Sequence, residues 1–168
     1  DYLVIATHAD QALKLIDKPT NDEKKILSEF EYTLNRAYLH SDRSIMPKNK
    51  KTWSSWNFIK SKKEDINFTL TYWMNNLQKL KTKKEYFVTI NPEKIPKTSH
   101  NEVSFKHPKF NLQTMKSQKK LKYLQGVNNT FFCGAYHGYG FHEDGIQSAA
   151  YISKMLNVDI PWKRDNNF

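Results

Sequence analysis

Residues 132–145 read FCGAYHGYGFHEDG, a glycine-rich turn between a short apolar segment and a helical pattern. The segment 130–133 is rich in residues that favour β-structure and is predicted to be a buried strand. A helix is predicted from about Glu143 to Leu156. Its expected buried residues are Ile146, Ala149, Ala150, Ile152 and Met155. A strand, a glycine-rich turn and a helix in this order place backbone N–H groups at the helix N-terminus, where a ligand can bind.

The chemistry of this turn restricts the ligand that it could accept. Gly134, Gly138 and Gly140 allow close backbone approach and positive φ angles. The helix opens with Glu143 and Asp144, which suit the helix dipole but would repel a phosphate. We therefore expect an uncharged polar ligand part, such as a sugar-like chain or the edge of a heterocycle. Three aromatic side chains could wall a flat ring: Tyr136, Tyr139 and Phe141. A purely structural turn with ordinary helix-capping acids is equally compatible with these residues.

The segments before the turn show residue patterns typical of strands and of helices. Residues 2–6 form an apolar run, predicted to be a buried strand, and residues 11–16 have helical spacing. A further helix starts at Thr20 or Asn21 and buries Ile26, Leu27 and Phe30. Strands are then predicted at 31–40, 53–59, 67–73 and 86–90, with a short helix at 74–80 and an edge strand at 103–108. Trp53, Trp56, Tyr72 and Trp73 are expected either in the core or in a substrate pocket.

A helical pattern returns at residues 111–125 and ends at Gly126. Its expected apolar stripe is Leu112, Met115, Leu121 and Leu124. The order of the predicted helices and strands is explained by a largely antiparallel sheet domain inserted between two α/β pieces. A buried strand at the first residues indicates a chain cut from a longer one, although a first strand within an ordinary sheet would read the same way.

Composition excludes several classes of protein. The 168 residues hold 27 Lys and Arg against 17 Asp and Glu, giving a formal charge of +10. No apolar run approaches the roughly 20 residues of a membrane-spanning helix, and the single cysteine, Cys133, excludes an intramolecular disulfide. Only three of the basic residues are arginine, which weakens the signature of nucleic-acid binding. A solvated basic surface is favoured, and a weak attraction to an anionic membrane surface is left open.

At the turn the sequence resembles the C-terminal flavin-contacting segment of the flavin-containing amine oxidoreductase superfamily. More narrowly, it is similar to the branch known as predicted NAD/FAD-binding proteins. Other segments agree in order and spacing: 4–13 (VIATHADQAL), 35–42 (NRAYLHSD), 46–47 (MP), 53–57 (WSSWN), 71–75 (TYWMN) and 88–92 (VTINP). The resemblance extends over nearly the whole chain, to about Asn157. No single segment is decisive, but together they are specific.

The resemblance implies an α/β fold in which an FAD-binding Rossmann-type domain is interrupted by an antiparallel-sheet substrate domain. Residues 1–17 would be a strand and helix of the FAD domain, 18–110 the substrate domain, and 111–168 the return to the FAD domain. The family's G-x-G-x-x-G motif is absent, so the chain resembles roughly the C-terminal 40% of such an enzyme. The expected partner is therefore the missing N-terminal half of the FAD domain.

The resemblance also assigns roles to particular residues. Ala6 and Thr7 would face the cofactor at a strand end. Gly134, Ala135 and Tyr136 would line the ribityl chain, although many family members carry an acid where this chain has Ala135. The N-terminus of the last helix would meet the pyrimidine edge of the flavin. The implied cofactor-binding set is completed by Gly140, Phe141, His142, Glu143, Asp144 and Gly145. Tyr136 and His142 are the candidate catalytic residues, and no metal site is expected because no ligand spacing fits one.

The implied function is that of an FAD-dependent, NAD(P)-binding type oxidoreductase. It would transfer a hydride from an amine or a lipid or acyl substrate to the flavin, and the fragment alone would be inactive. The expected localisation is cytoplasmic, with peripheral membrane association left open, and no nucleic-acid partner is expected. The alternative is a non-enzymatic basic module that binds nucleic acid or an anionic surface.

Overall fold

The computed structural model describes residues 1–60 and 69–162. The chain divides into two compact units, which we call unit 1 (Asp1–Thr33 and His107–Phe168) and unit 2 (Leu34–Lys106). This division differs from the expected one, because residues 18–33 and 107–110 belong to unit 1 rather than to a substrate domain. The physical reason is that Ile26, Leu27 and Phe30 pack in the same apolar core as Ile5.

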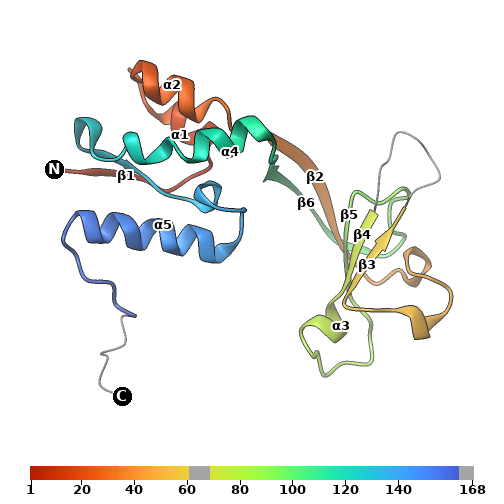
Figure 1. Cartoon of the computed structure of the whole chain (residues 1–168). Helices are drawn as coiled ribbons and strands as arrows, with labels where there is room; N and C mark the ends of the chain where they lie inside the picture. Colours follow the sequence, from red (N-terminus) through yellow and green to blue (C-terminus); the bar gives the residue numbers. More distant parts are fainter. Residues whose placement is uncertain (61–68, 163–168) are drawn as a thin grey trace. The chain divides into compact units, whose positions relative to one another are not determined.

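Unit 1 is built around two short parallel strands. β1 (Leu3–Ile5) pairs with β7 (Thr130–Phe132), with Val4 opposite Phe131. The helices α1 (Ala9–Leu15), α2 (Asn21–Leu27) and α4 (Leu112–Gln118) lie on one side of this pair, and α5 (His142–Met155) lies on the other (Figure 1).

Successive side chains of β7 pack into two hydrophobic cores of unit 1, one on each side of the strand pair. Phe132 is buried with the residues of α1 and α2, whereas Phe131 and Cys133 pack against Ile152 of α5. Successive side chains of a strand point to opposite faces, so one short strand can anchor helices on both sides. This arrangement makes unit 1 a layered α/β structure, although two parallel strands do not by themselves define a dinucleotide-binding domain.

The N-terminus of α2 is fixed by a reciprocal capping box. The Thr20 hydroxyl accepts a hydrogen bond from the Glu23 N–H at 3.2 Å, and the Glu23 carboxylate accepts one from the Thr20 N–H at 2.6 Å. Two otherwise unpaired backbone donors are thereby satisfied. Thr20 is the cap, as one of the two predicted alternatives.

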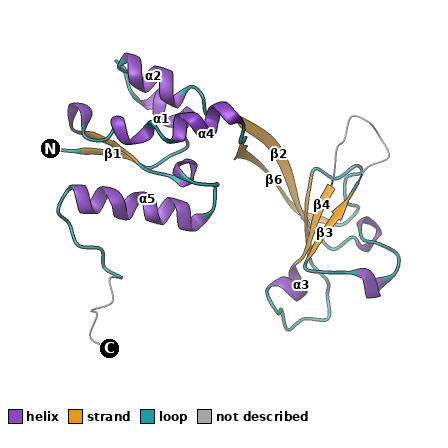
Figure 2. Ribbon diagram, in the orientation of Figure 1, coloured by secondary structure: helices purple, strands orange, loops and turns teal. Residues whose placement is uncertain are grey.

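Unit 2 contains most of a five-stranded sheet in the order β3-β4-β5-β2-β6 (Figure 2). Its strands are β2 (Tyr32–His40), β3 (Trp56–Ile59), β4 (Thr69–Trp73), β5 (Phe87–Ile90) and β6 (Ser99–Pro108). The pairs β2–β5, β3–β4 and β4–β5 are antiparallel. α3 (Met74–Leu77) interrupts the connection from β4 to β5. The chain is therefore a mixed α/β protein with an antiparallel sheet, as predicted.

Short 3-10 helices complete the described structure: Arg43–Ile45, Lys50–Thr52, Leu121–Tyr123, Val127–Asn129 and Ala135–His137. One of them corrects the predicted 111–125 helix, because α4 ends at Gln118 and the periodicity restarts at Leu121. The expected stripe is wrong in its first half, because Leu112 is 79% exposed and the buried residues of α4 are Thr114 and Ser117; Leu121 and Leu124 of its second half are buried.

The buried face of α5 also differs from the expected one. Ser148 and Ile152 are buried, whereas Ile146 and Met155 are exposed. Within residues 1–60 and 69–162, no helix has the length and apolar character required to cross a bilayer.

Candidate functional site

The carboxyl ends of β1 and β7 meet at one edge of unit 1. The Cys133 N–H donates to the Ile5 carbonyl at 3.1 Å, which continues the parallel pairing beyond the strands. Just past this point, a Cβ atom added to Gly134 would lie 2.9 Å from the Thr7 carbonyl oxygen. Only glycine allows the two chain segments to approach this closely. The structure thus brings Thr7 and Gly134 together at the strand ends.

Hydrogen bonds hold the turn after Gly134 from two helices. The Gln118 side-chain amide, at the end of α4, donates to the Tyr136 carbonyl at 3.0 Å and also to the Gly138 carbonyl. The Gly134 N–H donates to the Ser148 hydroxyl of α5 at 2.9 Å. These contacts fix the turn as a rigid edge of unit 1.

Gln118 and Ser148 were not identified from the sequence. Both look like ordinary polar residues of helices, and their partners are backbone groups that leave no mark on the residue pattern. Identifying them requires knowing that α4 and α5 lie beside the turn, which the sequence does not show.

The Asp144 carboxylate makes its hydrogen bonds within the turn itself. Its carboxylate oxygen Oδ2 accepts hydrogen bonds from the Tyr139 N–H at 3.0 Å and the Phe141 N–H at 2.9 Å. A Cβ atom on Gly138 would collide with the same carboxylate, so glycine is required there. Asp144 therefore caps α5 and shapes the turn, whereas Glu143 is exposed and accepts a hydrogen bond from Gln147.

The three aromatic side chains of the turn do not form one wall. Tyr136 is 3% exposed and its ring packs edge-to-face against Phe30, with the ring centres 5.2 Å apart. Tyr139 and Phe141 are exposed to solvent. The candidate catalytic residues are likewise separated, because Tyr136 belongs to the core and His142 is exposed at the start of α5.

Two buried polar atoms of the turn have no hydrogen-bond partner among the described residues: the Tyr136 hydroxyl and the His137 Nε2. Burial raises the pKa of Tyr136, and the nearby Cys133 and Tyr32 side chains add to this rise. Burial lowers the pKa of His137 to about 4, despite a hydrogen bond to the Phe132 backbone. At neutral pH both groups are therefore uncharged.

The unpaired hydroxyl of Tyr136 leads to a stability prediction. We expect Tyr136→Phe to raise the free energy of unfolding by about 1 kcal/mol, because it removes a buried polar atom without changing the ring. Urea denaturation followed by hydrogen exchange of the α5 backbone measures this change. A loss of stability instead would mean that the hydroxyl has a partner in the folded protein.

The remaining predicted site residues lie in three places. Ala6 is exposed beside half-buried Thr7 and Ala135 at the strand ends, and Gly145 faces the Ala135 backbone. Gly140 has a positive φ of 89° and lies against Pro108 and Phe110.

The described residues hold no group of three or more His, Cys, Asp or Glu side chains arranged for a metal ion.

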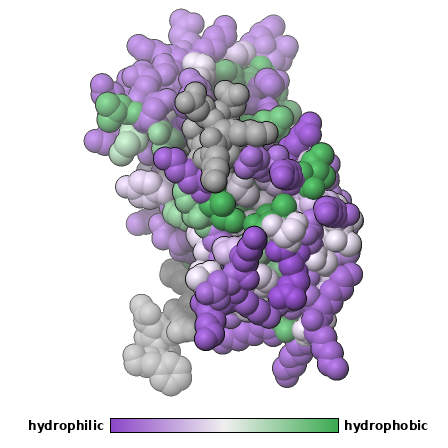
Figure 3. Space-filling view, turned by 90° about the vertical axis from the view of Figure 1, so that its right-hand side faces the viewer, coloured by the Kyte–Doolittle hydropathy of each residue, from purple (hydrophilic) through white to green (hydrophobic). Residues whose placement is uncertain are grey.

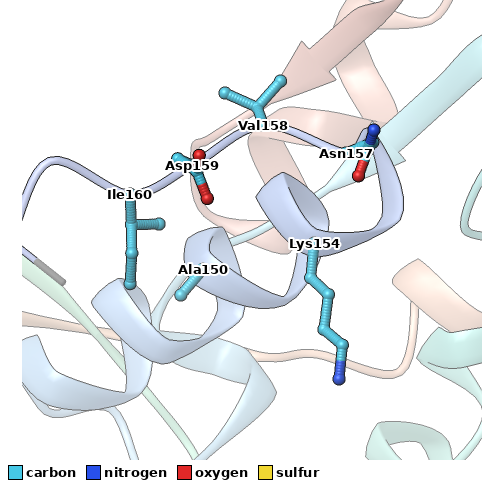
Figure 4. A pocket seen from close by; sticks show the side chains of 6 residues that line it. All are labelled: Ala150, Lys154, Asn157, Val158, Asp159 and Ile160. Carbon is cyan, nitrogen blue, oxygen red and sulfur yellow. The ribbon is translucent and has the colours of Figure 1, made fainter. Parts of the chain in front are cut away.

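Two of the hollows on the described surface lie beside α5 in unit 1. One, of about 200 Å³, is lined by His137, Gly138, Asp144, Gln147, Ser148 and Tyr151. The other, of about 410 Å³, lies at the C-terminal end of α5 and is lined by Ala150, Lys154, Asn157, Val158, Asp159 and Ile160 (Figure 4). Cofactor pockets usually enclose roughly 300–1,000 Å³, so the hollow at the glycine-rich turn is too small to enclose a flavin.

The turn therefore fits a flavin in part. The exposed strand-end residue Ala6, the exposed His142 and Glu143 and the N-terminus of α5 can form one side of such a site. The N–H groups of Gly134, Tyr139 and Phe141, however, are already bonded within the chain. This surface is open, so the described residues alone do not enclose a flavin.

Unit 2 presents an apolar face on its sheet. Two rows of side chains cross the strands: Trp56, Tyr72, Val88 and Leu39 in one, and Phe58, Leu70, Ile90 and Ala37 in the other. Trp56 is 61% exposed and Phe58 is 66% exposed. Trp56 also contacts the Tyr72 ring edge-to-face, with the ring centres 5.3 Å apart.

The opposite face of the sheet is buried and largely polar. The His40 Nε2 lies 2.7 Å from the Thr89 hydroxyl, which lies 2.9 Å from the Thr71 hydroxyl, and all three side chains are fully buried. The Asp42 N–H donates to His40 Nδ1, so Nε2 carries the proton of the neutral ring. This is the reverse of the usual pattern, in which the apolar face of an antiparallel sheet is covered.

The four aromatic residues of the sheet region therefore have different roles. Trp56 and Tyr72 lie on the exposed apolar face, whereas Trp53 and Trp73 pack edge-to-face against each other and Trp53 also contacts Phe87. A substrate pocket lined by these residues stays a prediction.

Comparison with known proteins gives structural likenesses but no match in sequence. No protein family and no curated protein matches the sequence. Among solved structures, the crystal structure of the CLA-producing fatty acid isomerase from P. acnes superposes with a TM-score of 0.59 and 12% sequence identity. The match covers 94% of this chain and 42% of the isomerase chain. At this identity the likeness concerns the fold alone, and the chain spans less than half the length of the isomerase.

Proposed function

We propose that the chain is part of an FAD-dependent oxidoreductase that acts on a lipid or acyl substrate. The observation that supports this most directly is the exposed apolar face of the sheet in unit 2. Trp56, Phe58 and Leu39 leave on this face a large apolar surface in contact with solvent. An acyl chain laid on such a surface is stabilised by about 0.8 kcal/mol for each CH₂ group that it buries.

The structural likeness is consistent with this substrate class. The protein with the similar fold is described as a fatty acid isomerase. An amine substrate, the other possibility implied by the sequence resemblance, is positively charged when protonated and is best stabilised by a carboxylate. The eight described side chains that form the two rows on the sheet face are aliphatic or aromatic, and none of these eight is acidic. We therefore favour an acyl chain over an amine.

Unit 1 would supply one side of a Rossmann-type flavin site. A bound flavin accepts a hydride from the substrate. The strand-end residues Ala6 and Thr7 and the backbone of Ala135 would lie along the cofactor, and the dipole of α5 would favour negative charge beyond His142. Tyr136 would act as a positioning residue, because its ring holds the turn to the core.

A partner half of the FAD domain would complete unit 1. β1 pairs only with β7 among the described strands, yet its side chains Leu3 and Val4 are exposed, as is Tyr2 beside it. Strands of parallel sheets are normally covered on both faces. The apolar surface of β1 therefore supports a partner that adds strands beside it.

Flavin content tests the cofactor part of the proposal. The chain would be produced alone and together with the polypeptide encoded immediately upstream of it, and the absorption spectrum of each purified sample recorded. We expect a flavin spectrum only in the combined sample, and Gly134→Ala, which displaces the strand ends, should reduce its flavin content. A combined sample that folds without flavin would contradict the assignment.

A fatty-acid titration tests the substrate part with the chain alone. A fluorescent polyene fatty acid would be titrated into the protein and into the double variant Trp56→Ser, Phe58→Ser. We expect the variant to bind at least tenfold more weakly, since it loses most of the exposed aromatic area. The matched control is Leu112→Ser, Tyr123→Ser, which removes two exposed apolar side chains from unit 1. Equal weakening by both variants would argue against a specific surface on the sheet.

A further inference from the structure

The positive charge of the protein is concentrated in unit 2. Residues 34–106 hold 15 Lys and Arg against 6 Asp and Glu, whereas the rest of the chain holds 12 against 11. Nine of the ten net charges thus lie in fewer than half of the residues. A general coding bias toward lysine would not produce this asymmetry, so the charge has a local cause.

One loop combines this charge with exposed apolar side chains. Residues 77–84 read LQKLKTKK, which we call the lysine–leucine loop. All eight side chains are exposed, including Leu77 at 42% and Leu80 at 37%. The loop contains four lysines, no acid and no arginine. Apolar and hydrophilic side chains also lie beside one another on the face of the molecule drawn in Figure 3.

The loop is held in a defined shape by Asn75. The Asn75 side chain donates to the Lys84 carbonyl at 2.8 Å and accepts from the Tyr86 N–H at 2.7 Å. The Leu80 N–H donates to the Asn75 carbonyl at 3.0 Å, and Lys79 takes a positive φ of 52°. Because the loop is already ordered, binding through it loses little conformational entropy.

The acid that follows the loop in the sequence is paired elsewhere. Glu85 follows it directly, but its carboxylate is engaged by Arg43 Nε at 2.9 Å and by Lys50 Nζ. The four lysines of the loop are exposed and can meet an external anionic surface, although Lys84 Nζ lies 5.5 Å from the centre of the Tyr86 ring. Leucines among solvated lysines have no function for a nucleic-acid phosphate backbone, which is contacted by cations and hydrogen-bond donors. They suit the boundary between lipid headgroups and acyl chains.

We propose that the lysine–leucine loop docks unit 2 on an anionic phospholipid bilayer. Leu77 and Leu80 enter the headgroup boundary, and Lys79, Lys81, Lys83 and Lys84 contact the lipid phosphates. The association is peripheral and reversible, and it is independent of whether unit 1 binds a flavin.

Vesicle sedimentation tests the proposal with the full chain. The probe is phosphatidylcholine vesicles with and without phosphatidylglycerol, at low and high salt. We expect binding only to the anionic vesicles, with affinity that falls as salt rises. Equal binding to pure phosphatidylcholine would overturn the proposal, as would tighter binding to a DNA duplex than to the anionic vesicles.

Two variants and a matched control locate the docking surface. The first variant replaces all four lysines of the loop by glutamine: Lys79→Gln, Lys81→Gln, Lys83→Gln and Lys84→Gln. It should weaken vesicle binding more than tenfold, since each lysine at the surface contributes about fivefold. Leu77→Ser with Leu80→Ser should weaken it at unchanged charge. The control replaces four exposed lysines of unit 1 by glutamine: Lys116, Lys119, Lys120 and Lys122. Thermal melts verify folding, and equal losses from the loop and control variants would overturn the proposal.

Discussion

Gly134→Ala should lower the free energy of unfolding of unit 1 by about 2–3 kcal/mol. The added Cβ would meet the Thr7 carbonyl oxygen at 2.9 Å and the Tyr136 ring at 2.8 Å. Neither neighbour can move freely, because Thr7 follows a paired strand and Tyr136 is packed in the core. Urea denaturation followed by hydrogen exchange of residues 130–156 reports on unit 1. Tryptophan fluorescence is less useful here, since three of the four tryptophans lie in unit 2.

The same glycine-rich segment provides a control of opposite sign. At Gly145 the nearest atom to an added Cβ is the Ala135 nitrogen at 3.7 Å, an ordinary contact. Gly145 lies inside α5, where alanine is preferred to glycine by about 0.8–1 kcal/mol. Gly145→Ala should therefore stabilise unit 1. If both substitutions destabilised it equally, the close approach at Gly134 would not be the cause.

Acidification should destabilise unit 1 through His137. Burial lowers the pKa of this ring to about 4 in the folded protein, compared with about 6.5 when unfolded. The unfolded chain binds the extra proton more readily below pH 6.5. The contribution to stability is therefore complete above pH 6.5 and is lost as pH falls toward 4, by about 3 kcal/mol in total.

His137→Asn separates this effect from general acid unfolding. Asparagine can keep a side-chain N–H near the Phe132 backbone but does not titrate. Denaturation of the variant at several pH values should show a smaller loss of stability between pH 6.5 and 4. Some loss should persist, because burial also lowers the pKa of His40 in unit 2. The exposed His142→Gln serves as control, and an unaltered profile in His137→Asn would refute the prediction.

Elements that are determined by their own residues were predicted well, and features that depend on contacts between distant segments were not. The strands of unit 2 were predicted near their observed positions because alternating aromatic and threonine residues mark β-structure directly. The part of the predicted strand 67–73 at residues 67 and 68 lies outside the described residues. The predicted helix 111–125 was too long, because α4 ends at Gln118, and Leu112 and Met115 of its expected stripe are exposed within α4 itself. Thr114 is buried there since its hydroxyl donates to the Glu29 carbonyl, a contact from a distant segment.

The candidate site was predicted in outline but not in detail. The glycine-rich turn before a helix was visible in the residues, and its need for close backbone approach follows from glycine alone. The inward direction of Tyr136 was not visible, because a turn has no periodicity that assigns a side chain to the core. Asp144 was likewise read as a ligand contact, although its carboxylate bonds the Tyr139 and Phe141 N–H groups. Which face of the sheet is buried also depends on contacts beyond the strands.

The pairing of β1 with β7 has a consequence for synthesis on the ribosome. Leu3 needs Thr130 as its neighbour, and the α1–α2 core needs Leu121 and Phe132. Residues 1–33 therefore emerge long before their partners, while the residues of unit 2 are translated consecutively. We expect unit 2 to acquire structure first on the nascent chain, and the N-terminal apolar run to depend on chaperones until translation passes β7.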